Sequence, residues 1–454
     1  MHQTNTYKEK IKLFTVILFP ILVTQLGLYS MSFLDTAMSG QVSPEDLAGV
    51  AVGSSIWVPV YTGLSGIFMA VTPMVAQLAG AKKTDGVPFI VIQGLYLSVA
   101  MTIVVLLTGF LALEPVLSLL PLENEVETIA KDYLIALSFG ILPLFIYGVL
   151  RSFIDSLGMT RITMLITLLT LPVNFILNYL LIFGKFGFPA LGGAGAGAAT
   201  SLTYWAAAGI TLILLKKHAP LASFSLFEQF YKVSLQKWKE ILSIGIPIGM
   251  AIFFETSIFA AVTLFMSEYS TVTIASHQAA LNFASFLYMI PLAISMALTI
   301  VVGFESGAKR WQDAKQYSYL GILTGVILSL ITAAVILMFR GQIASIYTED
   351  AEVLNLTKTF LIYAVFFQIS DAVAAPIQGA LRGYKDVRFT FYAALVSYWA
   401  IGLPVGFCLA QYTGLEAFGY WIGLIAGLAA GAGGLSLRLV KIQKTVGLPV
   451  QQKQ

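Results

Sequence analysis

Charge is scarce in this chain, and so are cysteine and histidine. Charged residues make up 11% of the 454 positions, against about 25% in typical soluble domains, which is too little charge to cover a soluble globule. The single cysteine, Cys408, cannot form an internal disulfide. The net charge of +3 provides no concentrated basic face of the kind that binds nucleic acid. These shortages exclude a large water-facing domain, a disulfide scaffold and a nucleic-acid-binding protein.

Hydrophobic residues are abundant instead, at 58% of the chain, and they gather in blocks of about twenty residues, each long enough to span a bilayer. We therefore predict an all-α integral membrane protein with twelve transmembrane helices. Their expected positions are about 13–38, 50–79, 88–113, 130–152, 162–183, 193–215, 241–266, 274–305, 317–339, 357–380, 389–412 and 417–440.

The basic residues predict the orientation of the chain. In the twelve-span topology, 22 of the 26 Lys and Arg fall on one side, and the other side keeps only Lys131, Lys185, Arg340 and Lys358. The positive-inside rule places the lysine-rich side in the cytoplasm. We expect a multi-pass protein of the cell membrane with both termini cytoplasmic, inserted by an uncleaved first helix.

An internal repeat appears when the sequence is shifted against itself by 227 positions. Pro20 then matches Pro247, and Gly-Ala-Lys-Lys at 80–83 matches Gly-Ala-Lys-Arg at 307–310. The predicted organisation is an N-terminal six-helix lobe (1–215), a cytoplasmic connector (216–240) and a C-terminal six-helix lobe with a short tail (241–454). Six spans per half predict a parallel pseudo-twofold repeat around a central cleft, complete as a monomer. The small residues at 192–199 are expected to allow close helix packing.

Three acidic residues fall well inside the expected spans: Asp35, Glu255 and Asp371. An ionised carboxylate at a helix centre costs roughly 2.5–3.5 kcal/mol even on a lenient insertion scale, so such groups normally face a cavity, an ion or a partner. No Lys or Arg is expected deep in any span. The acids are therefore protonated, hydrated or neutralised by a cation from outside, unless they are protonated and serve only to fasten helices together.

Polar side chains follow these acids at helical spacing. One stripe includes Gln25 and Asp35, another runs through five residues from Thr163 to Asn178, and a third includes Gln368, Asp371 and Arg382. Faces rich in oxygen atoms suit hard monovalent cations, so Glu255 and Asp371 are candidate ligands for such a cation. The side chains of these stripes could equally form hydrogen bonds between helices.

Aromatic, methionine and amide side chains suit hydrophobic cations. The candidate substrate-cavity residues are Gln25, Tyr29, Tyr61, Gln278, Asn282, Phe286, Met289 and Gln368.

Four motifs resemble the multidrug and toxic compound extrusion (MATE) family, in particular its NorM-type branch: DTAMSG at 35–40, PVNFILNY at 172–179, FFE at 253–255 and QGALRG at 378–383. The resemblance covers nearly the whole chain. It implies an antiporter that exports cationic amphiphilic compounds in exchange for Na⁺ or H⁺, with no cofactor besides that ion. It also implies a site of Asp35, Asn174 and Asn178 in the N-lobe and of Glu255 and Asp371 in the C-lobe. Some relatives carry an acid in place of Asn178, so the resemblance does not decide between Na⁺ and H⁺ as the coupling ion.

Two alternatives differ in chemistry. A flippase for a lipid-linked phosphate would need Lys or Arg in its cavity, whereas the expected cavity is acidic. A membrane-embedded prenyl or acyl transferase would need clustered acids for magnesium or a histidine base, whereas the three acids lie on separate helices. We therefore expect a transporter and not an enzyme.

Overall fold

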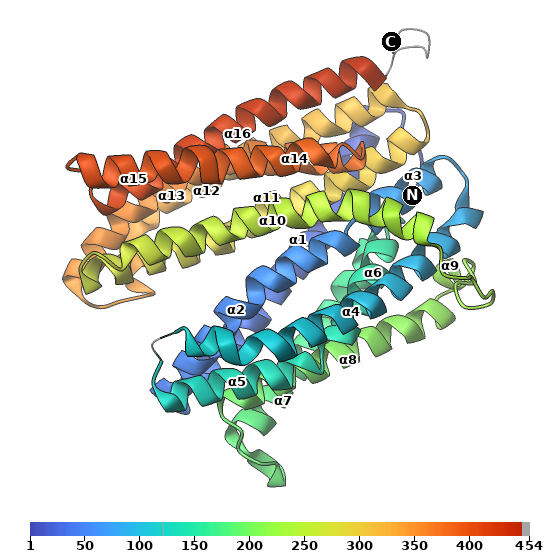
Figure 1. Cartoon of the computed structure of the whole chain (residues 1–454). Helices are drawn as coiled ribbons and strands as arrows, with labels where there is room; N and C mark the ends of the chain where they lie inside the picture. Colours follow the sequence, from blue (N-terminus) through green and yellow to red (C-terminus); the bar gives the residue numbers. More distant parts are fainter. Residues whose placement is uncertain (121, 447–454) are drawn as a thin grey trace. The chain divides into compact units, whose positions relative to one another are not determined.

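The computed structural model describes residues 1–120 and 122–446, in which all regular secondary structure is helical and no strand occurs. The first part of the chain (Figure 1) forms α1 (Tyr7–Ser39), α2 (Pro44–Phe68), α3 (Val71–Gly80), η1 (Thr84–Gly86), α4 (Val87–Ser118), α5 (Asn124–Ser138), α6 (Ile141–Ser156), α7 (Thr160–Phe183), η2 (Lys185–Gly187), α8 (Gly193–Lys217) and α9 (Ala219–Ala222). The remainder forms α10 (Leu235–Met266), α11 (Thr271–Gly307), α12 (Trp311–Ser345), α13 (Ala351–Gly383), α14 (Val387–Ala394), the π-helix η3 (Leu395–Gly402), α15 (Leu403–Tyr412) and α16 (Ala417–Val446).

Eleven helical segments in the described residues are long and apolar enough to cross a membrane, and a bent pair, α5 with α6, makes a twelfth. The all-α membrane fold expected from the hydropathy blocks is thereby confirmed. Large apolar side chains such as Phe110 (85% exposed) and Leu264 (72% exposed) point outward, as expected for helices whose outer surface faces lipid.

The bend between α5 and α6 measures 51° and follows from Pro143. A proline has no N–H and its ring clashes with the carbonyl four residues earlier, here that of Phe139. The Phe139 carbonyl instead accepts a hydrogen bond from Trp205 Nε1 at 3.1 Å. Gly140 allows α8 to approach at this point, since a Cβ there would lie 2.7 Å from the Ser201 Cα. The fourth expected span is therefore a broken helix.

The helices form two compact units, each described here separately. The N-unit is Val23–Gly245, and the C-unit is Met1–Leu22 together with the chain from Ile246 onward. The N-terminal lobe predicted from the sequence (1–215) includes the first 22 residues. They belong to the C-unit because the apolar face of early α1 (Phe14, Ile17 and Ile21) is buried in the hydrophobic core of that unit. Correspondingly, the first turns of α10 belong to the N-unit.

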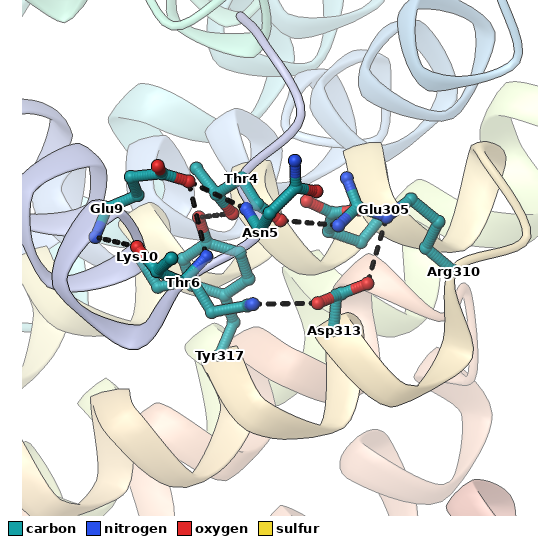
Figure 2. A network of polar contacts seen from close by, with 9 residues as sticks. All are labelled: Thr4, Asn5, Thr6, Glu9, Lys10, Glu305, Arg310, Asp313 and Tyr317. Carbon is teal, nitrogen blue, oxygen red and sulfur yellow. Dashed lines mark hydrogen bonds and ion pairs between the residues drawn. The ribbon is translucent and has the colours of Figure 1, made fainter.

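A polar network holds the N-terminal segment within the C-unit (Figure 2). Thr6 and Glu9 form a capping box at the start of α1: the Thr6 hydroxyl accepts from the Glu9 N–H at 3.2 Å, and the Glu9 carboxylate accepts from the Thr6 N–H at 3.2 Å. Buried Lys10 pairs with Asp313 at 2.7 Å. The segment that begins the chain is thus fixed by its own cap and by α12.

Arg310 and Tyr317 extend this network. Arg310 Nε lies 2.9 Å from the Asp313 carboxylate and 3.4 Å from that of Glu305, and its Nη2 donates to the Thr4 carbonyl. The Thr4 and Tyr317 hydroxyls are hydrogen-bonded at 2.9 Å, and both residues are fully buried. Two acids, Glu305 and Asp313, lie beside two bases, Lys10 and Arg310, and the exposed Glu9 of the capping box is a third acid of the network (Figure 2).

The segment before α10 is held in the N-unit by a different contact. Gln93 on α4 donates to the Lys232 carbonyl at 2.8 Å and accepts from the Ser234 N–H at 2.9 Å. Lys237 pairs with Glu240 in the same segment and stands 227 positions after Lys10. Equivalent segments of the two halves are thus fixed by different contacts: the first includes ion pairs with α12, whereas the second is held by a glutamine that binds two backbone groups.

Backbone geometry also follows the repeat. Lys82 and Lys309, related by the 227-residue shift, both adopt a left-handed conformation, with φ of 57° and 58°. Gly158 and Lys385 form a second such pair, with φ of 76° and 61°. Non-glycine residues rarely take positive φ, so the same unusual turn at matched positions indicates that both halves turn in the same way between helices.

Candidate cation sites in the two units

Asp35 lies in the N-unit and is 7% exposed. Its Oδ1 accepts from Asn178 Nδ2 at 2.7 Å and from Asn174 Nδ2 at 3.3 Å, and its Oδ2 accepts from the Thr200 hydroxyl at 2.7 Å. All three donors are neutral, so they stabilise the carboxylate without cancelling its charge. The Oδ1 of Asn178 is buried and has no hydrogen-bond partner among the described residues. This cluster therefore offers one negative charge and one unused amide oxygen.

The sequence builds this cluster by helical spacing and close packing. Asn174 and Asn178 are one turn apart on α7, so both amides reach the same carboxylate. Thr200 reaches it because α8 approaches α7 closely: a Cβ on Gly195 would lie 2.5 Å from the Leu181 carbonyl oxygen. The expectation that the small residues at 192–199 serve close helix packing is confirmed. The resemblance to the MATE family implied a site of Asp35 with both asparagines, and Thr200 was not among the predicted residues.

Glu255 and Asp371 lie in the C-unit, on α10 and α13, and are 5% and 2% exposed. Glu255 Oε1 accepts from the hydroxyls of Tyr288 and Tyr398 at 3.2 and 3.4 Å. Asp371 accepts no hydrogen bond from any described residue, and it interacts electrostatically with Glu255. Two like charges thus share one buried environment with only two neutral donors. In the described part of the chain no group of three or more His, Cys, Asp or Glu is placed to hold a metal ion.

Tyr398 reaches Glu255 from the π-helix η3, which lies between α14 and α15. π-helical turns are rare and commonly occur at functional sites. Small residues allow this wide turn to pack on α16, since a Cβ on Gly427 would lie 2.2 Å from the Ser397 carbonyl oxygen. Nothing in the apolar sequence around Tyr398 distinguishes a π-helix from an ordinary helix, and sequence reasoning therefore missed this residue.

Arg382 is a buried basic residue in the last turn of α13. It was expected at the cytoplasmic end of its helix, yet it is 3% exposed and interacts electrostatically with Glu255. Its Nη2 donates to Gln378 Oε1 at 3.3 Å, whereas its Nε and Nη1 have no hydrogen-bond partner among the described residues. The helical spacing that placed Arg382 on the face of Asp371 was the available signal.

A second charged cluster of the N-unit was also missed, because the fourth span was expected to end at residue 152. Asp155 is 3% exposed, accepts from the Thr163 hydroxyl at 2.6 Å and pairs with Arg151 Nε at 3.5 Å. Arg151 Nη2 donates to Gln25 Oε1 at 2.8 Å. Two residues of the expected polar stripes, Gln25 and Thr163, thus bind an internal ion pair.

The remaining candidate substrate residues are distributed over both units. In the N-unit, Tyr29 is part-buried, and Tyr61 is stacked on Trp57 with ring centroids 6.1 Å apart. In the C-unit, four residues at helical spacing occupy one face of α11; among them are Asn282, which accepts from the Tyr347 hydroxyl at 3.1 Å, and Phe286, which is 41% exposed. The other two are Gln278, which is exposed, and Met289, which is part-buried.

Gln368 is buried on α13 and donates to the Thr332 hydroxyl of α12 at 3.0 Å, so one of its polar atoms serves helix packing. Its Oε1 has no hydrogen-bond partner among the described residues. The role of these eight residues in holding a substrate stays a prediction.

Comparison with known proteins places this arrangement in a family. The MatE family model matches residues 20–180 and 247–408, and the two matched ranges begin 227 positions apart, the same shift that aligns the two halves of the sequence. "Probable multidrug resistance protein NorM" of Bacillus subtilis (strain 168) is 62% identical over 444 residues, 98% of each chain. The protein of the same name from Halalkalibacterium halodurans is 58% identical over 98% of this chain and 97% of its own.

Solved structures of MATE transporters have a similar fold. The eukaryotic MATE transporter AtDTX14 superposes with a TM-score of 0.86 at 20% identity, covering 97% of this chain and 98% of its own. A multidrug resistance MATE family transporter in an outward-facing conformation gives 0.86 at 18% identity, over 98% of this chain and 100% of its own. At these identities the likeness shows the fold.

The many helices that are long and apolar enough to cross a membrane, in this fold, define a multi-pass membrane protein. The chain belongs to the MatE family of multidrug efflux transporters, and the relatives that share more than half of its residues carry the NorM name.

Proposed function

We propose that this protein is a secondary active antiporter that exports cationic amphiphilic compounds in exchange for Na⁺ or H⁺. The observation that carries the proposal is the presence, in each unit, of a buried acidic cluster with unused hydrogen-bonding capacity. Asp35 is held only by neutral donors beside the unpartnered Asn178 Oδ1, and Asp371 accepts no hydrogen bond from the described residues. Buried carboxylates so arranged attract a proton or a cation.

Coupling would follow from competition for these carboxylates. An ion that enters from outside favours one orientation of the transporter, and a cationic substrate favours the other, which is alternating access by differential binding. The prolines at matched positions in α1 and α10, Pro20 and Pro247, each remove a helical hydrogen bond. They supply sites at which these helices can bend during the exchange.

Replacing the acids by amides tests this function. Cells that express the Asp35→Asn or Asp371→Asn variant should lose resistance to ethidium while the protein stays in the membrane. Asp132→Asn, which alters an exposed acid on α5, should leave resistance unchanged. Undiminished ethidium efflux in both Asp35→Asn and Asp371→Asn would contradict the antiport proposal.

The coupling ion and the orientation need separate experiments. Ethidium uptake into vesicles that contain the protein, driven first by an imposed Na⁺ gradient and then by a proton gradient, identifies the ion. For orientation, we propose that both termini are cytoplasmic. A cysteine introduced near either end in a Cys408→Ser background should then react with an impermeant maleimide only after the cells are opened.

A further inference from the structure

The part of α1 that belongs to the N-unit is bound to neighbouring helices at two points. At the first, the Asp35 carboxylate accepts a hydrogen bond from Asn178 at 2.7 Å. At the second, ten residues earlier and so about 15 Å along the helix, Gln25 Oε1 accepts from Arg151 Nη2 at 2.8 Å. The function proposed above uses the contact at Asp35 and leaves the contact at Gln25 without a role.

The second contact, which we call the Gln25 clamp, consists of Gln25, Arg151, Asp155 and Thr163 and joins α1, α6 and α7. Arg151 Nε pairs with the Asp155 carboxylate at 3.5 Å, and the Thr163 hydroxyl donates to Asp155 Oδ1 at 2.6 Å. A guanidinium has donors and no acceptor, so it binds the oxygen of the Gln25 amide. The charges of Arg151 and Asp155 cancel, and the clamp therefore offers a cation no uncompensated charge.

Both contacts lead to α7, which carries Thr163 of the clamp and Asn174 of the Asp35 site. Gln25 precedes Asp35 by ten residues on α1, and Thr163 precedes Asn174 by eleven on α7, so two helices with the same rise per residue match at both points. Between them the helices touch, because a Cβ on Gly27 would lie 2.9 Å from the Cγ2 atom of Thr167. A shift of α1 at the clamp therefore also shifts Asp35 relative to its donors.

The clamp is specific to the N-unit. The 227-residue shift relates Gln25 to Ile252, Arg151 to Gln378 and Asp155 to Arg382. Gln378 and Arg382 bind each other at 3.3 Å on one helix, and Ile252 has no polar atom with which to bind either. The matched positions of the C-unit thus cannot form the same contact, and the clamp occurs in the half whose candidate site has a single acid.

We propose that Arg151 is a positioning residue for the cation site at Asp35: through Gln25 it holds α1 in register with α7. The inference rests on the proposed function, in which Asp35 binds a cation. A guest at Asp35 competes with the neutral donors of the carboxylate, whereas the clamp has no free charge and keeps its bonds. α1 therefore stays aligned while the carboxylate exchanges its partners, and the donors are in place when the guest leaves.

Ethidium titration of the purified full-length protein tests this in two backgrounds. Glu255→Gln/Asp371→Asn removes the acids of the C-unit site, and Asp35→Asn removes that of the N-unit site. Arg151→Gln should weaken ethidium binding about tenfold in the first background, the order expected for one hydrogen bond to a charged group, and should have no effect in the second. Arg151→Lys keeps a charged donor and should retain most of the affinity. Arg161→Gln, which removes an exposed arginine of α7, should change neither background.

Gln25→Leu covers the case in which Arg151→Gln does not fold, because it removes the acceptor and leaves the ion pair intact. A direct contact between Gln25 and the guest would also weaken binding, so the distance between the two helices is measured without a guest. Spin labels on Phe33→Cys and Ile176→Cys, at exposed positions of α1 and α7, in a Cys408→Ser background should give a narrow distance distribution. Gln25→Leu should broaden it.

Equal losses of affinity in both backgrounds would show a general structural role, and an unchanged affinity or an unchanged distance distribution would show that the clamp does not position α1. Each of these results overturns the positioning inference and leaves the antiport proposal standing. The same holds if Glu255→Gln/Asp371→Asn binds no ethidium while the wild-type protein does. A wild-type protein that binds no ethidium overturns both.

Discussion

Thr200 and Asp35 lie 165 positions apart in the chain, and the Thr200 hydroxyl donates a 2.7 Å hydrogen bond to the Asp35 carboxylate. A hydrogen bond to a charged group contributes roughly 1.5–3 kcal/mol. Thr200→Val keeps the shape of the side chain and removes the donor, so the ionised carboxylate loses part of its stabilisation. We expect cation binding at Asp35 to weaken by about tenfold, measured by ethidium titration of purified protein. Thr203→Val, which removes a buried hydroxyl bonded within α8, is the matched control and should bind normally.

Tyr288 and Tyr398 both donate to the same oxygen of Glu255. Replacing either by Phe leaves the other donor in place, whereas the double replacement leaves Glu255 with no donor among the described residues. We therefore expect the double variant to lose more ethidium resistance than the two single losses combined. Tyr392→Phe, at a tyrosine that is 59% exposed on α14, should have no effect. Strict additivity of the two single changes would argue that the tyrosines act independently of Glu255.

Gly195 and Gly209 allow a direct test of helix packing, because both lie on α8 and only Gly195 is crowded. A Cβ at position 195 would lie 2.5 Å from the Leu181 carbonyl oxygen, whereas one at position 209 would meet nothing within 4 Å. Overpacking typically costs about 1–3 kcal/mol, so Gly195→Ala should lower the unfolding temperature by several degrees. Gly209→Ala should leave it equal or raise it slightly, since alanine favours helix. Thermal unfolding in detergent measures both, and equal temperatures would contradict the close α7–α8 contact.

Lys10 and Asp313 form an ion pair in which the lysine side chain is 3% exposed. Removing one partner of a buried pair leaves an uncompensated charge and costs roughly 3–5 kcal/mol. Asp313→Asn should therefore destabilise the protein by about 3 kcal/mol. Glu240→Gln breaks the more exposed pair with Lys237 and should cost less than about 1 kcal/mol. Denaturant unfolding distinguishes the two, and a large loss in Glu240→Gln alone would reverse this assignment.

Hydropathy and the 227-residue repeat were sufficient to predict the fold class, because spans of about twenty apolar residues have few alternatives. Helical spacing placed Asn174 and Asn178 on one face of their helix, whereas the grouping of both with Asp35 was implied by the resemblance to the MATE family. The hydropathy pattern did not predict that Leu22, at the end of the first apolar stretch of α1, belongs to the C-unit. Hydropathy predicts that a helix face is buried, but it does not predict which helices cover that face.

The residues missed at the sites were those that reach across from another helix or lie at a helix end. Thr200 and Tyr398 are ordinary residues of apolar helices, and only the close approach of α8 and the π-helix bring them to the acids. Asp155 lies near the end of α6, where a charged residue is normally expected to face solvent. Arg382 was predicted on the face of Asp371, but its burial near the end of α13 was not expected for the same reason. Their burial depends on tertiary packing, which the local pattern does not encode.

The exchange of segments between the halves affects how the chain is made. Domains generally fold from the N-terminus as they leave the ribosome, yet Met1–Leu22 completes a unit whose remainder begins at Ile246. This first segment stays without its final neighbours until the second half has been synthesised and inserted. Expressing the two halves as separate polypeptides would therefore leave each unit lacking a helical segment that the other polypeptide carries, and neither should accumulate without its counterpart.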